Sequence, residues 1–262
     1  MNTLLLEPSA PLALAVTQAI KAGDLSTLHD LLGANPGLAA ARIGGECKGI
    51  WMSRSLLHVL TDWPGNWPNA AATAAMLIGA GADVNARFVG THTETPLHWA
   101  ASSDDTEVID VLVDAGADID ARGAVIADGT PLTDAVAFGQ WKAARRLIER
   151  GATSSFRESA ALGLIDRVQQ RLTQAPPPTP QAITEAFWYA CHGGQRREAE
   201  YLFNRGANLN WIGYDSLTPL DAAMRSGAIE LASWLERQGG RNARAHAPGS
   251  SSVRDTSGGS RL

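Results

Sequence analysis

A four-residue motif recurs along this chain and constrains its fold more than any other feature. Thr95-Pro96-Leu97-His98 returns as Thr130-Pro131-Leu132-Thr133 and again as Thr218-Pro219-Leu220-Asp221. About twenty residues after each copy comes a glycine, at Gly116, Gly151 and Gly239. Repetition of this kind is typical of solenoids, in which each unit buries its apolar face only by stacking against its neighbours.

The residues between the motif and the glycine predict two helices in each unit. The threonine supplies an N-cap oxygen, and proline at the first helical position loses no donor that the helix needs. In the first copy, Val108, Ile109, Leu112 and Val113 have the i, i+3, i+4 spacing of an apolar helical stripe, which Gly116 ends. The sequence therefore predicts a succession of helix–turn–helix units.

Thr-Pro-Leu-His-x-Ala-Ala followed by Gly-Ala-Asp resembles the ankyrin repeat, and residues 95–118 match that pattern almost position for position. The resemblance covers about residues 12–241 and implies an all-α ankyrin-repeat solenoid with short finger loops. It implies about seven units, which start near Leu14, Ser55, Thr95, Thr130, Ser154, Glu185 and Thr218. The motif usage is similar to that of small stand-alone ankyrin-repeat proteins of bacteria. Residues 1–11 are predicted to be an N-terminal segment, and residues 242–262, rich in Ser and Gly, a disordered polar tail.

The predicted stack is irregular at three places. Residues 62–69, which include Trp63 and Trp67, are an insertion between the two helices of the second unit. Residues 44–49 contain glycines and a lysine but lack the Gly-Lys-[Ser/Thr] ending of a phosphate-binding loop, so we interpret them as a long first finger. The fifth unit is degenerate, and residues 176–180 follow it as a stiff, proline-rich connector.

Charge and cysteine content exclude several classes of function. The formal net charge is −5 and no basic face is evident, which disfavours binding to nucleic acid or to an anionic membrane. Cys47 and Cys191 are far apart and form neither a disulfide framework nor a C-x-x-C site, which favours a reducing cytosol. Glu7, Pro8 and Pro11 interrupt the apolar N-terminal stretch, and no run approaches the ~20 apolar residues of a membrane helix. We expect a cytoplasmic monomer without a cofactor.

In the ankyrin fold that the resemblance implies, the first helices and the fingers line a concave groove. The positions that face this groove carry many aromatic and acidic side chains, and the eight tryptophans outnumber the five phenylalanines. Each tryptophan is either an interface anchor or a filler between helices, although we expect Trp63 and Trp67 to be exposed because their loop has no core to enter. The candidate partner-binding residues are Asp62, Trp63, Trp67, His92, Glu94, Trp99, Ser102, Ser103, Asp134, Phe138, Trp188, Tyr189, His192, Trp211 and Tyr214.

A metal site is considered and not predicted. His92, Glu94 and His98 superficially resemble a ligand set. His98, however, is the motif histidine, whose ring usually bonds to backbone at the turn, and the same holds for His58. Only His92 and Glu94 would remain, and two ligands are too few.

A second polar grouping leaves three interpretations open. It consists of Asp62, Ser102, Ser103, Asp134, Glu158 and His192. Asp134 and His192, with Asp62, form a carboxylate–imidazole set of the kind that general acid/base catalysis uses. The same residue types also make an ordinary polar interface, or a solvated helix surface without a site. Cys191 is next to His192, but on a helix the two side chains point about 100° apart, so we expect Cys191 to be a packing residue.

Two hypotheses of function follow from the groove. The first, which we favour, is an interaction scaffold that binds a partner protein or peptide carrying Lys or Arg in an aromatic, acidic groove. The alternative is an enzyme or small-molecule binder with a central pocket at Trp99, Asp134 and His192. An enclosed pocket in which Asp134 and His192 come within hydrogen-bond reach would favour the alternative.

Overall fold

The computed structural model describes residues 4–246, and these residues form fourteen α-helices and one three-stranded sheet. The chain divides into two compact units, Met1–Glu158 and Ser159–Leu262, and the boundary falls within α9 (Phe156–Ala161). Within residues 4–246, no helix combines the length and the apolar character needed to cross a lipid bilayer. Most of the predicted disordered tail, residues 247–262, lies outside the described part of the chain.

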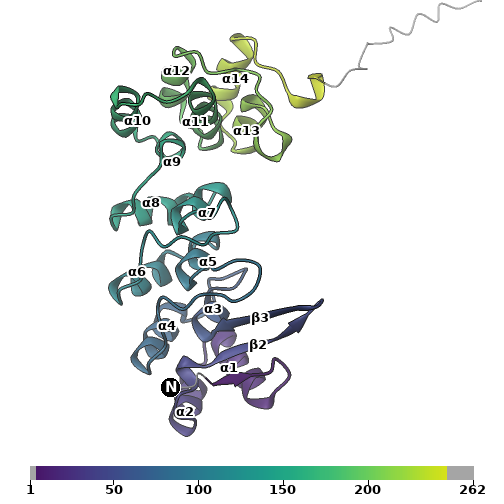
Figure 1. Cartoon of the computed structure of the whole chain (residues 1–262), viewed down its shortest axis with the longest axis vertical. Helices are drawn as coiled ribbons and strands as arrows, with labels where there is room; N and C mark the ends of the chain where they lie inside the picture. The colour runs from purple at the N-terminus through teal and green to yellow at the C-terminus, as the bar shows by residue number, and fades with distance from the viewer. Residues whose placement is uncertain (1–3, 247–262) are drawn as a thin grey trace, which may run out of the picture. The chain divides into compact units, whose positions relative to one another are not determined.

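In the first unit the helices pack in consecutive pairs that form two layers (Figure 1). α3, α5 and α7 follow one another in one layer, and α4, α6 and α8 in the other. Leu57 on α3, Leu97 on α5 and Leu132 on α7 are fully buried, as stacking of the repeats predicts. The helices are α1 (Pro11–Ala22), α2 (Leu25–Ala34), α3 (Leu56–Thr61), α4 (Ala70–Gly79), α5 (Pro96–Ser102), α6 (Thr106–Asp114), α7 (Pro131–Ala137) and α8 (Trp141–Glu149).

The motif residues begin their helices as the sequence predicts. Thr130 and Thr218 accept a hydrogen bond from the backbone amide three residues later. His98 Nδ1 lies 2.9 Å from Thr95 Oγ1, and its Nε2 lies 3.5 Å from the carbonyl oxygen of Gly129 in the next unit. His58 is bonded in the same way, with Nε2 3.1 Å from the Glu94 carbonyl oxygen. The predicted backbone-bonding role of both histidines is confirmed.

The expectation of an all-α chain is wrong at residues 5–6 and 42–55. β2 (Arg42–Cys47) pairs antiparallel with β3 (Ile50–Ser55), and β1 (Leu5–Leu6) pairs parallel with β2. The finger that we expected as a loop is therefore a β-hairpin. Its two turn residues, Lys48 and Gly49, both have positive φ, 51° and 79°, as a two-residue turn of type I′ requires.

The hairpin projects on the side of the unit where α3, α5 and α7 lie (Figure 1). Paired residues share a face, so Gly45 and Met52 lie on one face and Glu46 and Trp51 on the other. Ser53 exchanges both of its main-chain hydrogen bonds with Val89, each at 2.9 Å. The hairpin is thereby tied to the chain that precedes the next repeat.

The predicted insertion between α3 and α4 is tied to its neighbours on both sides. Asn66 Nδ2 donates to the Ser103 carbonyl at 2.8 Å, and Asn69 Nδ2 donates to the Gly23 carbonyl at 2.9 Å. Trp63 is 80% exposed, as expected. The expectation for Trp67 is wrong, because its ring is half-buried and lies 5.3 Å from the Lys21 ammonium, in the range of a cation–π contact.

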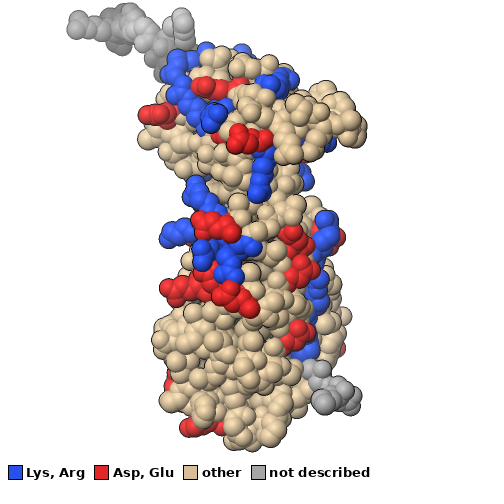
Figure 2. All heavy atoms as spheres, turned by 90° about the vertical axis from the view of Figure 1, so that its left-hand side faces the viewer, with Lys and Arg blue, Asp and Glu red and all other residues tan. Residues whose placement is uncertain are grey.

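The outer face of the first unit carries a network of ion pairs. The side on which α4, α6 and α8 lie faces the viewer in Figure 2, where charged side chains gather beside a broad uncharged area. Asp110 on α6 accepts hydrogen bonds from Arg146 at 2.7 Å and from Arg150 at 2.8 Å. Both bonds lower the pKa of Asp110, and the bond from Arg146 has the larger effect. The network ties α6 to α8, whereas α4 contains no charged residue.

The second unit contains the remaining helices: α10 (Ile165–Thr173), α11 (Pro180–His192), α12 (Arg196–Phe203), α13 (Pro219–Arg225) and α14 (Ile229–Arg237). α11 begins five residues before the predicted start at Glu185, because Thr179 Oγ1 accepts from the Ala182 amide and Pro180 occupies the first turn. Phe187 is fully buried in the core of this unit. Beyond α14, Asn242 Nδ2 donates to Asp221 Oδ1 at 2.7 Å, so the ordered chain extends past residue 241.

Candidate functional site

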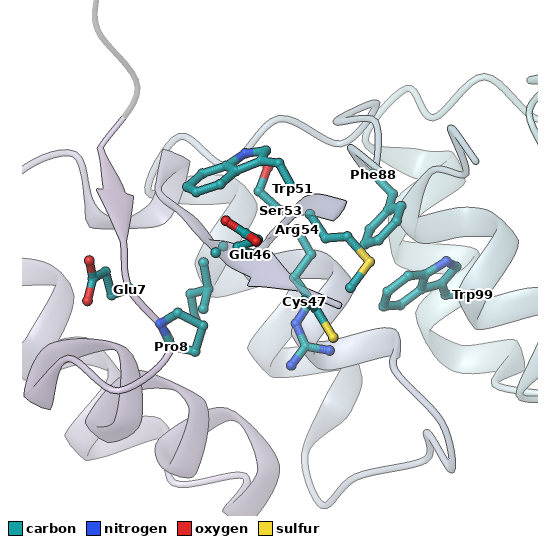
Figure 3. Close-up of a pocket in the computed structure, with 13 residues that line it drawn as sticks. Glu7, Pro8, Glu46, Cys47, Trp51, Ser53, Arg54, Phe88 and Trp99 are labelled. Carbon is teal, nitrogen blue, oxygen red and sulfur yellow. The ribbon is translucent and has the colours of Figure 1, made fainter. Parts of the chain in front are cut away.

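A hollow of about 740 Å³ opens beside the β2–β3 hairpin in the first unit (Figure 3). Its lining comes from Glu7 and Pro8, from hairpin residues 43–47 and 51–54, and from Phe88 and Trp99. Residues of both hairpin faces contribute, together with the chain before the first helix and the first helix of a later repeat. The hairpin therefore creates the hollow, and a short finger loop in its place would not form one.

Gly45 leaves room in the wall of the hollow. A Cβ atom at Gly45 would meet only the Pro8 ring, with Cδ at 3.5 Å and Cγ at 3.8 Å, which is ordinary van der Waals contact. The neighbouring Gly44 is different, because a Cβ there would lie 2.4 Å from Ser53 Cβ and 2.5 Å from the Met52 carbonyl oxygen. Gly44 is thus required by the pairing of the strands, whereas a side chain at Gly45 could be accommodated beside Pro8.

The unpaired charge of the hollow is negative. Arg54 Nη1 donates to Asp62 Oδ2 at 2.6 Å, so the cation of the lining is neutralised by a predicted site residue. Among residues 4–246, the carboxylates of Glu7 and Glu46 have no ion-pair partner. Aromatic and aliphatic side chains surround these groups, which is the composition of a site that binds an amphipathic ligand.

Trp99 contributes to the wall from α5, and its neighbours fix its ring. Its Nε1 donates to Glu94 Oε2 at 2.7 Å, and Glu94 Oε1 accepts from the Val125 amide at 2.8 Å. His92 stacks on Phe88 with ring centroids 4.3 Å apart, and its Nδ1 lies 3.1 Å from Glu94 Oε2 without the angle of a hydrogen bond. The structure thus brings together the predicted residues His92, Glu94 and Trp99.

Asp134, on α7, is buried without compensation. Its side chain is 1% exposed, and within the described residues its Oδ1 has no hydrogen-bond partner. Burial raises the pKa of Asp134 to about 8, and the charge of Glu94 adds to the shift. The residues that line the hollow do not include Asp134.

The smaller polar residues of the first unit serve local structure. Ser102 Oγ donates to the Trp99 carbonyl at 3.0 Å, and buried Ser103 donates to the Thr61 carbonyl at 3.4 Å. Phe138 is 57% exposed at the end of α7.

In the described part of the chain, no three His, Cys, Asp or Glu side chains gather in a way that would hold a metal ion.

In the second unit, the predicted aromatic residues form a separate cluster. Trp188 is 2% exposed and donates its Nε1 to the Leu217 carbonyl at 2.9 Å. Tyr214 is 38% exposed, so it presents part of the cluster to solvent. The ring centroids of contacting pairs lie between 5.2 and 6.4 Å apart among Trp188, Tyr189, His192, Trp211 and Tyr214. Trp188 therefore fills space between helices rather than acting as an exposed interface anchor.

Cys191 is fully buried in the same unit, and burial raises the pKa of its thiol. A buried thiol in apolar surroundings is unreactive. The predicted packing role of Cys191 is confirmed.

Comparison with known families identifies the stacked helices. Residues 65–157 match the family model of ankyrin repeats, in three copies. Residues 65–157 are therefore ankyrin repeats. The match covers α4 to α8, which include the copy of the motif that the sequence pattern indicated most strongly. Ankyrin repeats are protein–protein interaction modules, which present extended binding surfaces on their stacks. No curated protein matches this chain.

Several residues of the hollow are absent from the predicted set. Glu46, Trp51 and Met52 lie on the hairpin, and Phe88 lies between the hairpin and Trp99. The sequence signal for the hairpin is weak, since Gly49 is typical of a two-residue turn but Lys48 is not among the residues that usually precede it. The position of Phe88 carried no such signal.

Proposed function

We propose that this chain is an interaction module that holds a segment of a partner protein in the hollow between the hairpin and Trp99. The observation that supports this most is the hollow itself, which is lined by Trp51, Met52, Phe88 and Trp99 with unpaired carboxylates at its rim. Large apolar side chains beside a few polar groups are typical of recognition sites. We also propose that the helix pairs outside residues 65–157 are ankyrin units, seven in total, and that the protein acts as a cytoplasmic monomer.

The lining supports a flexible peptide segment more than a folded surface as the ligand. A hollow of about 740 Å³ accommodates a few side chains rather than a broad interface. The hydrogen bonds between Ser53 and Val89 hold the hairpin in place, so the wall exists before a ligand arrives.

The test is selection of random linear peptides, displayed on phage, against the full-length chain. Each selected peptide is then synthesised with a fluorophore, and its Kd is measured by fluorescence anisotropy against wild type and two leucine variants. Gly45→Leu fills the hollow, and Gly33→Leu places the same side chain on exposed α2, where a Cβ meets nothing within 4 Å. We expect Gly45→Leu to weaken binding about tenfold or more and Gly33→Leu to leave it unchanged.

Urea unfolding of both variants checks that the fold is retained. Peptides that bind Gly45→Leu as tightly as wild type would contradict the proposal, because their site would lie elsewhere on the chain.

The alternative function, an acid/base enzyme, is supported by one observation. A carboxyl whose pKa is raised to about 8, as in Asp134, is poised for proton transfer near neutral pH. A general acid must also reach its substrate, and Asp134 is 1% exposed and does not line the hollow. Asp134 and His192 belong to different units of the chain. We therefore rank the interaction module first.

A further inference from the structure

We infer that the hollow recognises a cationic side chain of its partner segment, arginine in preference to lysine, between Trp51 and Glu46. This inference rests on the proposed function and adds to it the chemistry of the residue that is recognised. It follows from the strand register, the charges around the hairpin and the exposure of two side chains.

The strand register places Trp51 and Glu46 side by side. The two residues are direct cross-strand partners, so their side chains share one face of the hairpin. The main-chain N–H and C=O of Ser53 both bond to Val89, so Gly44–Ser53 is a non-hydrogen-bonded pair of the hairpin. Such pairs alternate along an antiparallel ladder, so Glu46–Trp51, two residues further, is also a non-hydrogen-bonded pair. Side chains approach most closely in such pairs. Figure 3 accordingly shows the Trp51 ring next to the Glu46 carboxylate.

Both groups are available to a ligand. Trp51 is 52% exposed although it is a large apolar ring, and Glu46 is exposed and has no ion-pair partner within the described chain. An exposed indole beside an unpaired carboxylate gains both a cation–π contact and a charge-assisted hydrogen bond from a partner that is cationic and has an apolar stem.

Within residues 4–246, no cationic side chain forms an ion pair with Glu46. Arg54 lies on the opposite face of the hairpin and is paired with Asp62. Arg42 shares the face of Glu46, but it is four residues away, about 13 Å along an extended strand. Its guanidinium is already bonded to Ser53 and to the Arg87 carbonyl. Lys48 is at the exposed turn and does not line the hollow.

The chemistry of the pair favours arginine. A guanidinium is planar, so it stacks on an indole face while its edge donates two parallel hydrogen bonds to a carboxylate. A lysine ammonium makes the same cation–π contact and a single charge-assisted bond. A neutral side chain of the same shape makes neither.

The experiment uses the selected peptides described above and a double-mutant cycle. In each peptide whose binding is sensitive to Gly45→Leu, basic residues are replaced singly, arginine by citrulline and lysine by norleucine. Affinities are measured for wild type, Glu46→Gln, Trp51→Leu and the matched surface control Glu107→Gln. We expect arginine to be enriched at one peptide position and its replacement by citrulline to weaken binding to wild type about tenfold or more.

The cycle then separates this inference from the proposed function. If Trp51 and Glu46 hold the cation, the citrulline effect falls to about twofold or less in Glu46→Gln and is unchanged in Glu107→Gln. Peptides that depend on Gly45 but bind equally well with citrulline would overturn the inference and leave the interaction module intact. Peptides that bind Gly45→Leu as tightly as wild type would overturn both the inference and the proposed function. Trp51→Leu is expected to weaken binding of the arginine-containing peptides. Urea unfolding of this variant, at an exposed site, verifies that the weaker binding is not caused by loss of fold.

Discussion

The indole of Trp99 donates a hydrogen bond to Glu94, from Nε1 to Oε2 at 2.7 Å. The other oxygen of this carboxylate accepts from the Val125 amide in the loop before α7. A single buried side chain thus joins α5 to the finger of the next repeat and fixes the ring that lines the hollow. The bonds of Glu94 therefore connect the stability of the stack to the shape of the site.

Glu94→Gln is expected to lower the free energy of unfolding by about 1–3 kcal/mol. The amide offers one acceptor and one donor where the structure needs two acceptors, so a buried N–H is left facing a donor. Urea unfolding followed by circular dichroism measures the change. Glu107→Gln, on the surface of α6, is the control and should stay within about 0.5 kcal/mol of wild type.

Gly44→Ala is expected to disrupt the hairpin, whereas Gly45→Ala is tolerated. The first methyl group would collide with Ser53 and the backbone of Met52, and the second would touch only Pro8. Amide hydrogen exchange of residues 42–55 measures the difference directly. Equal protection of the hairpin in both variants would show that the strands adjust to the added methyl group.

Asp134→Asn is expected to make the protein less sensitive to rising pH. Burial raises the pKa of Asp134 from 3.8 to about 8, so between these values the folded chain keeps a proton that the unfolded chain has released. The free energy of unfolding therefore falls as pH rises, by up to about 1.4 kcal/mol per pH unit, and asparagine removes this slope. Thermal unfolding at pH 5, 6, 7 and 8 compares the two proteins, and parallel curves would contradict the assignment.

Acid is expected to unfold the protein through His58 and His98. Burial is the largest cause that lowers the pKa of His58 to about 3 and that of His98 to about 4, from an ordinary value of 6.5. Below pH 6.5 the unfolded chain takes up protons that the folded chain refuses, so the free energy of unfolding falls as pH falls. Each histidine lowers the free energy of unfolding by about 1.4 kcal/mol for each unit by which the pH falls, until the pH reaches the pKa of that histidine in the folded chain.

Because Asp134 acts in the opposite direction, the histidine slope is best measured in the Asp134→Asn background. Urea unfolding between pH 5 and 6.5 should give a slope that His98→Gln reduces by about half. An unchanged slope in the double variant would mean that protonation of His98 does not drive acid unfolding.

The helical part of the fold was predictable because its signals are local. Thr130 and Pro131 begin α7 by capping and by a preset backbone angle, and both effects act within one turn of helix. The sequence predicts a unit that starts near Glu185, and α11 extends five residues further toward the N-terminus because Thr179-Pro180 has the same capping chemistry. The sequence predicts a loop rather than a hairpin at residues 44–49, because Lys48-Gly49 lacks the Asn or Asp that usually marks a two-residue turn.

The candidate site was less predictable because its contacts cross between repeats. His92, Glu94 and Trp99 were selected from their positions in the repeat, and the structure brings them together. The burial of Asp134 depends on how the surrounding elements pack, which no local pattern records. The contribution of Phe88 and Trp51 depends on the strand pairing that was not predicted.

The two hydrogen bonds between Ser53 and Val89 have a kinetic consequence. A hairpin held on its outer edge does not have to rearrange before a ligand enters, so association should follow a single exponential whose rate rises linearly with ligand concentration. Differences in affinity among ligands would then reside in how long each one stays bound rather than in how fast it arrives.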